Sequence, residues 1–148
     1  MIFDQKDWPA GRMVTPTLAG TRPGGAISSA WAVMHYLGIE GYRQKQQSVT
    51  RARASIEAGV AELGFEVLGA PKLGIMAFSH PELDIFALYK RLFERGWVTS
   101  LCTQPKALHL MLSPFHETVV AQYLTDLTWA VAQVRAGVTD AVTEVRYS

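Results

Sequence analysis

The residues with the clearest chemical potential lie in one loop near the N-terminus, at positions 15–25. Hydroxyl side chains recur there at Thr15, Thr17 and Thr21, and Arg22 adds one guanidinium. Glycines between them allow a ligand to approach the backbone closely, and the loop leads into the start of a predicted helix. These groups typically receive a phosphate or a carboxylate. The spacing alone also fits an ordinary proline- and glycine-rich connection, because it matches neither a Walker loop nor the dinucleotide-binding fingerprint.

Elsewhere in the chain the sequence shows no self-sufficient catalytic or metal-binding set. His109 and His116 are seven residues apart and do not have the spacing of zinc ligands. The single cysteine, Cys102, has no neighbouring activator and is expected to be a structural thiol. The five lysines flank turns or lie on polar helix faces, whereas a Schiff-base lysine needs burial. We therefore expect no catalytic residue and no metal site within this chain.

The composition is typical of a globular domain with an ordinary core. The chain has 148 residues, of which 49% are hydrophobic and 18% are charged, and its formal net charge is +1. This length suits one domain, and the near-neutral charge argues against an electrostatic nucleic-acid surface. One cysteine excludes an internal disulfide, and no apolar run reaches the ~20 residues of a membrane span. We expect a cytoplasmic protein.

The hydrophobic pattern predicts an α+β fold. Prolines and glycines are too frequent in residues 1–25 for a helix or a long strand, so this segment is expected to be irregular. Beyond it the pattern predicts helices at 27–37, 42–63, 84–95 and 117–135, and strands at 65–68, 74–79, 97–102 and 107–113. In the last strand Leu108 and Leu110 alternate with His109 and Met111, which indicates one buried face. About four mostly antiparallel strands with helices packed mainly on one face form a two-layer sandwich.

Five short motifs occur in an order that matches one enzyme family. They are Asp-Trp-Pro-Ala-Gly at 7–11, Pro-Thr-Leu-Ala-Gly-Thr-Arg-Pro-Gly at 16–24, Glu-Gly-Tyr at 40–42, Asp-Ile-Phe at 84–86 and Arg-Gly-Trp at 95–97. His109 and His116 also match histidine positions of that family. Together the motifs resemble the sphingosine-1-phosphate lyases over residues 3–135. These are pyridoxal-phosphate (PLP) enzymes of fold type I, close to the group II amino-acid decarboxylases.

The resemblance implies that residues 26–148 are the small C-terminal α+β domain of a homodimeric lyase. Residues 1–25 would be the active-site and hinge loop that joins it to a large domain. In that loop Thr21, with Gly20 and Arg22, would contact the PLP phosphate of the neighbouring subunit. The family's cofactor-binding lysine follows a histidine and lies upstream of this segment, and the present chain contains no His-Lys pair. The resemblance therefore implies a domain that helps to close a PLP site but is inactive alone.

Alternatives of other classes stay open at this point. The chain could be a free-standing binding or regulatory module without catalysis, or the small domain of an amino-acid decarboxylase. A separate polypeptide could also supply the large domain. The sequence does not separate a phosphorylated amino alcohol from an amino acid as substrate, because the selective residues of the family lie mostly in the large domain.

Overall fold

The computed structural model describes residues 2–7, 9–15 and 19–138, and the chain divides into two compact units, Met1–Gly41 and Tyr42–Ser148. The first unit begins with an antiparallel hairpin of β1 (Phe3–Gln5) and β2 (Met13–Thr15). The prediction that residues 1–25 are wholly irregular is therefore wrong. The two strands of the hairpin are only three residues long, so the sequence between the flanking prolines and glycines is too short to show a period-2 pattern.

An ion pair joins the residue directly before β2 to the middle of β1. The guanidinium of Arg12 donates to both carboxylate oxygens of Asp4, with N–O distances of 2.9 and 2.6 Å. Both side chains are solvent-exposed, so the pair adds little stability by itself. The division into two units falls after Gly41, and the assignment of residues 26–148 to one small domain stays a prediction. The role of residues 1–25 as an active-site and hinge loop stays a prediction.

The longest helix, α1 (Gly24–Glu62), is interrupted at Gly38. Gly38 has φ 59° and ψ −176°, which are not helical angles, so the element consists of two helices joined at this residue. The sequence predicted this break from the glycines that follow residue 37, and the prediction is confirmed. The second helix belongs to the unit Tyr42–Ser148 and buries Val49, Ala52, Ile56 and Val60 along one stripe.

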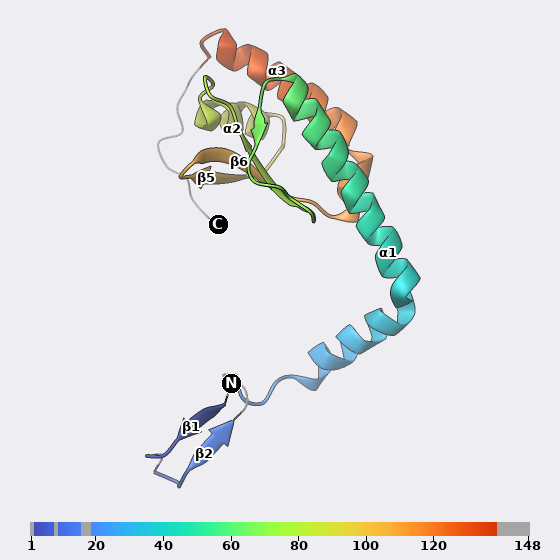
Figure 1. Cartoon of the computed structure of the whole chain (residues 1–148), viewed down its shortest axis with the longest axis vertical. Helices are drawn as coiled ribbons and strands as arrows, with labels where there is room; N and C mark the ends of the chain where they lie inside the picture. Colours follow the sequence, from blue (N-terminus) through green and yellow to red (C-terminus); the bar gives the residue numbers. More distant parts are fainter. Residues whose placement is uncertain (1, 8, 16–18, 139–148) are drawn as a thin grey trace. The chain divides into compact units, whose positions relative to one another are not determined.

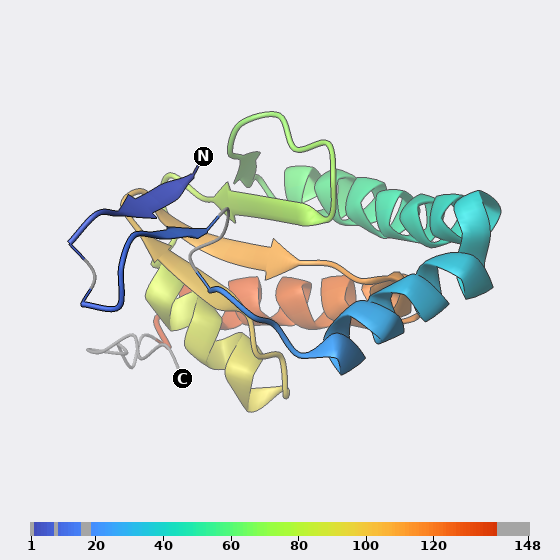
Figure 2. The ribbon, with the colours of Figure 1, turned by 90° about the horizontal axis from the view of Figure 1, so that it is seen from below.

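The second unit is built on a four-stranded antiparallel sheet, seen in Figure 2. Its strands in sequence order are β3 (Glu66–Val67), β4 (Ile75–Ser79), β5 (Ser100–Thr103) and β6 (Lys106–Met111). Across the sheet the order is β3-β4-β6-β5. All four predicted strands are present, although β3 and β5 are shorter than the sequence predicted. Every pairing between neighbours is antiparallel, as expected.

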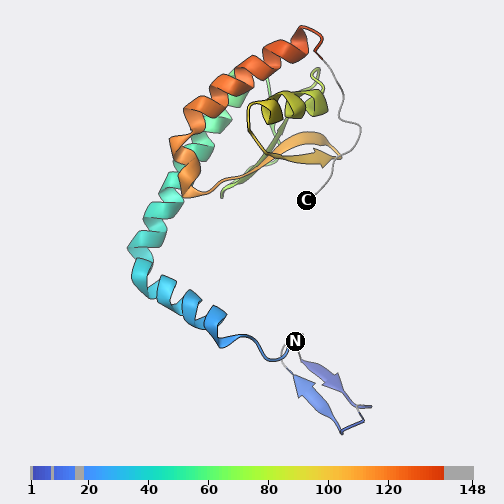
Figure 3. The ribbon, with the colours of Figure 1, turned by 180° about the vertical axis from the view of Figure 1, so that it is seen from behind.

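One face of this sheet forms the core of the unit. Phe78 and Leu108 face each other across β4 and β6, and Met76 faces Leu110 in the same way. These four side chains are buried, and they belong to a cluster with residues of α1, α2 (Ile85–Glu94) and α3 (Val120–Arg135). Figures 1 and 3 both show α3 running alongside the second half of α1. The helices therefore cover the buried face.

The opposite face of the sheet is open. Ile75 and Met111 pair across β4 and β6 and are 58% and 65% exposed. The next pair on this face, Ala77 and His109, is half-buried. The predicted alternation along residues 107–113 and the two-layer α+β arrangement are both confirmed.

The helix starts follow local hydrogen bonding. Asp84 caps α2, because its Oδ1 accepts from the backbone N–H of Phe86 at 2.9 Å. The last helix begins later than predicted. A 3₁₀ turn, η1 (Pro114–Thr118), comes first, and α3 starts at Val120 rather than at residue 117. Proline favours such a first turn because its missing N–H would have no helical partner there.

Gly74 lies directly before β4 and close to Leu112, which directly follows β6, so there is no room for a side chain at this position. A Cβ there would lie 2.7 Å from the carbonyl oxygen of Leu112 and 2.7 Å from a methyl of Val49. Gly74→Ala is expected to destabilise the protein by about 1–3 kcal/mol, because backbone has to shift. Urea unfolding measures the loss. Gly25→Ala is the matched control, since open space surrounds that helical position and alanine favours a helix. Equal stability of the two variants would contradict this packing.

Candidate functional site

The loop that the sequence singles out lies directly before α1. Gly20, Thr21 and Arg22 are all exposed, and Gly20 has a φ of 61°, in the left-handed region. Thr15 ends β2 and is half-buried. Thr17, the remaining hydroxyl of the predicted set, lies outside the described residues. The polar groups of Thr21 and Arg22 therefore stand at the surface, within a few residues of the helix start.

The surroundings of this loop suit an anion. Within the described ranges, neither Thr21 nor Arg22 makes a side-chain hydrogen bond or an ion pair. The first turn of α1, which begins at Gly24, contains no acidic residue. Its first backbone N–H groups lack helical partners, and the helix dipole places partial positive charge there. A hydroxyl, a guanidinium and backbone donors are together the groups that hold a phosphate.

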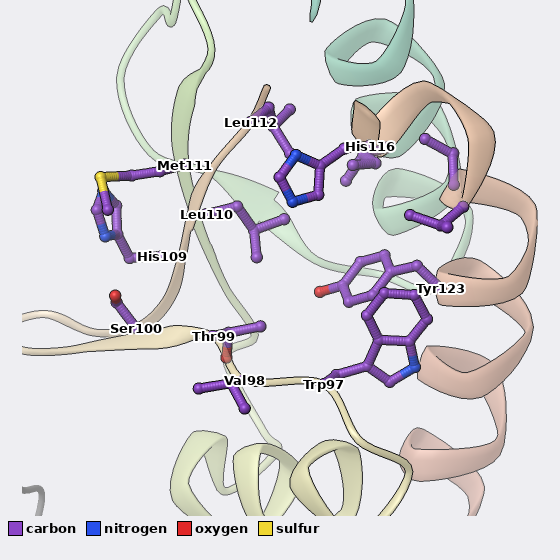
Figure 4. A pocket seen from close by; sticks show the side chains of 13 residues that line it. Trp97, Val98, Thr99, Ser100, His109, Leu110, Met111, Leu112, His116 and Tyr123 are labelled. Atoms are coloured by element: carbon purple, nitrogen blue, oxygen red, sulfur yellow. The ribbon is translucent and has the colours of Figure 1, made fainter. Parts of the chain in front are cut away.

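A second concave site, hereafter the Tyr123 pocket, lies within the unit Tyr42–Ser148. Its volume is about 170 Å³, and β5, β6, η1, α3 and the second half of α1 contribute its lining (Figure 4). Most of the lining is apolar and includes Ile56, Leu110 and Val120. No charged side chain of the described residues lines it. The Tyr123 pocket is therefore unsuited to a phosphate and differs in chemistry from the loop before α1.

His116 is part of this pocket and is fixed in orientation. Its Nδ1 accepts a hydrogen bond from the backbone N–H of Ser113 at 2.7 Å. A neutral ring that accepts at Nδ1 carries its proton on Nε2. Figure 4 shows the ring directed into the pocket. The histidine that the resemblance places at the turn into the last helix thus closes η1 and offers an N–H donor to the cavity.

Tyr123 supplies a deeply buried polar group of the pocket. Its side chain is 4% exposed, and its hydroxyl has no hydrogen-bond partner among the residues that the structure describes. Burial raises the pKa of this phenol, so it stays protonated. Thr99 Oγ1 is likewise buried without a described partner. Sequence analysis missed this pocket, because Tyr123 stands in the apolar stripe of α3 and nothing in that spacing distinguishes its hydroxyl.

Of the remaining candidates, His109 lies on β6 opposite Ser100, and both residues are part of the lining of the Tyr123 pocket. Cys102 is a half-buried free thiol on β5. Across the described residues, no group of three or more histidine, cysteine or acidic side chains could hold a metal ion. Over the same residues, no helix has both the length and the apolar character needed to cross a membrane.

Comparison with known proteins adds a consistent set of relatives, although no protein-family model matches the chain. Sphingosine-1-phosphate lyase of Arabidopsis thaliana is 37% identical over 131 residues, which is 88% of this chain and 24% of the relative. A probable L-tyrosine/L-aspartate decarboxylase of Methanothermobacter thermautotrophicus is 36% identical over 98 residues, covering 66% of this chain and 27% of the relative.

Solved structures similar to this chain are also a lyase and a decarboxylase. A sphingosine-1-phosphate lyase of Burkholderia pseudomallei superimposes with a TM-score of 0.80 and 30% identity, over 91% of this chain and 31% of that one. Glutamate decarboxylase of Lactobacillus brevis shares the fold, with a TM-score of 0.67 and 16% identity. The chain therefore spans about a quarter to a third of the length of these relatives. Its α+β architecture is that of a small domain of a fold type I enzyme.

Proposed function

Because this chain is homologous to part of the sphingosine-1-phosphate lyases, we propose that it is the C-terminal domain of a PLP-dependent carbon–carbon lyase. The observation that carries the proposal is the share of each chain that the structural match covers. The match extends over about nine-tenths of this chain but over less than a third of the relative of known structure. A match of that kind is expected of one domain of a larger enzyme. In the complete enzyme this domain closes the active site.

The loop before α1 is the part that would touch the cofactor. When bound, PLP acts as the electron sink for cleavage of a bond at or next to the substrate's Cα. Thr21 would donate a hydrogen bond from its hydroxyl to the cofactor phosphate of a partner subunit, and Arg22 would add positive charge beside it. Gly20 lets the backbone turn ahead of these two residues. Their exposure and the acid-free first turn of α1 support this role.

The first half of α1 has an exposed apolar surface, which supports the proposal that another domain packs against it. Large apolar side chains are exposed along this half of the helix: Ile27, Trp31, Val33, Met34 and Tyr36. Trp31 is 60% exposed and Tyr36 is 89% exposed, although side chains of this size contribute most to stability when buried. The proposed occupant of this surface is the large PLP-binding domain, which would lie in the part of the relatives that the match leaves uncovered.

In this proposal the Schiff-base lysine belongs to the large domain. The five lysines of this chain are Lys6, Lys45, Lys72, Lys90 and Lys106. None of them is buried, so none has the desolvated setting that activates an amine for attack on a carbonyl. The chain alone is therefore expected to be inactive. An amino-acid decarboxylase is the second candidate, and the similarity to the Methanothermobacter thermautotrophicus protein favours it.

A chimera tests the cofactor contact. This chain replaces the matching part of the Burkholderia pseudomallei lyase, and PLP affinity is measured by equilibrium dialysis. Thr21→Val removes the hydroxyl while keeping the shape, and it is expected to weaken PLP binding about tenfold, because a hydrogen bond to a charged group is lost. Thr21→Ser keeps the donor and should bind within about twofold of the parent. Unchanged affinity in the Thr21→Val chimera would refute the contact.

A further inference from the structure

We propose that the Tyr123 pocket binds a small uncharged molecule that combines an apolar body with one oxygen acceptor, such as a single-ring phenol or a compact alcohol. None of its lining residues comes from the loop before α1, and the proposal does not depend on the proposed function. Every residue that lines it belongs to the unit Tyr42–Ser148.

The size of the pocket limits its occupant. A cavity of about 150 Å³ lined by apolar side chains accommodates benzene, and the Tyr123 pocket has a volume of about 170 Å³. One aromatic ring with one or two further atoms therefore fits. Drug-sized ligands need cavities of ~300–1,000 Å³. The apolar walls, which include Ile56, Leu110 and Val120, provide contact for such a ring.

Two polar groups select the ligand's functional group. Figure 4 shows the Tyr123 hydroxyl and the His116 ring directed into the pocket. The hydroxyl is buried without a described partner, and leaving such a donor unpaired is unfavourable. His116 offers Nε2–H, because Nδ1 is engaged by Ser113. A single ligand oxygen, as in a hydroxyl or a carbonyl, accepts hydrogen bonds from such groups.

The same lining excludes charged ligands. No aspartate, glutamate, lysine or arginine of the described chain lines the pocket. An ionised carboxylate, phosphate or amine would lose its hydration there without gaining a counter-ion, which is strongly unfavourable. The occupant is therefore neither an amino acid nor a phosphate ester, the two substrate classes that the cofactor site would serve.

Ligand titration of the intact 148-residue chain tests the proposal, with phenol, toluene and benzoate followed by amide chemical shifts. Phenol should give saturable shifts at residues of the pocket, such as Thr99 and Val120. Toluene should bind about fivefold more weakly, since it lacks the oxygen, and benzoate should not bind. Absence of saturable binding by phenol, or toluene binding as tightly as phenol, would overturn the proposal. This comparison needs no variant.

Substitution then assigns the hydrogen bond. Tyr123→Phe removes only the hydroxyl and should make phenol and toluene bind within about twofold of each other. The variant should unfold at the same temperature or higher, because the hydroxyl it lacks has no described partner. Tyr89→Phe is the matched control, since Tyr89 lies on α2 outside the pocket, and it should keep the fivefold preference. If Tyr123→Phe also keeps that preference, the assigned hydroxyl is wrong.

Discussion

Replacing Asp126 with alanine is expected to lower the free energy of unfolding by about 3 kcal/mol. Asp126 is 5% exposed and accepts hydrogen bonds from Trp97 Nε1 at 2.9 Å, from Gln122 Nε2 at 3.0 Å and from the Arg95 guanidinium at 3.1 Å. Arg95 also stacks 3.9 Å from the ring centre of Trp129. Alanine would leave the indole N–H of the half-buried Trp97 without its acceptor and would release the arginine from its position.

The same carboxylate makes stability depend on pH. Hydrogen bonds from Gln122 and Trp97, together with the charge of Arg95, hold the pKa of Asp126 below its ordinary value. A group whose pKa is lower in the folded state stabilises the protein above its unfolded-state pKa and loses that contribution as the pH falls through the folded-state pKa. The advantage of the parent over Asp126→Ala should therefore be complete at pH 7 and shrink below about pH 4.

Urea unfolding at pH 7 and in acid measures both effects. Glu117→Gln is the control, because Glu117 pairs with Arg51 at the surface, where an ion pair contributes little. Asp126→Asn should lie between the parent and Asp126→Ala, since the amide oxygen still accepts from the indole. An Asp126→Ala variant as stable as the Glu117→Gln control would show that the network does not stabilise the fold.

Backbone amides of the two units are expected to exchange hydrogen at very different rates. No described residue of the segment 1–41 is buried, whereas Phe78, Leu88 and Leu108 in the second unit are fully enclosed. Exposed helices exchange by local opening, while core strands exchange only on global unfolding. Amides of β4 and β6 should exchange at least about 10³-fold more slowly than those of the first half of α1.

This experiment also separates the domain hypothesis from the free-standing module. If the first half of α1 normally packs on a large domain, its amides have low protection in the isolated chain. A self-contained binding module would instead protect residues 1–41 in a monomer. Strong protection of that segment, measured at a concentration at which the chain is monomeric, would contradict the domain hypothesis and favour the module.

The features of the fold that the sequence predicted well are those encoded locally. The alternation of Leu108 and Leu110 with His109 located the strand and its buried face, and Asp84 marked the start of α2 through its own hydrogen bond. Gly38 marked the break in α1. Each of these depends on side chains within a few positions of one another, which is the range over which periodicity and capping operate.

The features that the sequence did not predict depend on distant residues. Asp126 and Trp97 are 29 positions apart, and they come together only when α3 packs against the rest of its unit. The Tyr123 pocket needs five elements to form and has no counterpart in any one segment. The strands of the hairpin before residue 16 are too short to show the alternation of apolar and polar residues that indicates a strand. The proposed cofactor contacts Gly20, Thr21 and Arg22 came from family resemblance, and the structure adds their exposure and their position before α1.

The central claim is that this chain is a domain of a PLP enzyme whose Schiff-base lysine lies elsewhere. Incubation of the 148-residue chain with equimolar PLP, borohydride reduction and mass spectrometry of the peptides test it most directly. We predict no stoichiometric adduct on any of the five lysines. A one-to-one adduct at a single lysine, abolished when that lysine alone is changed to arginine, would contradict the claim.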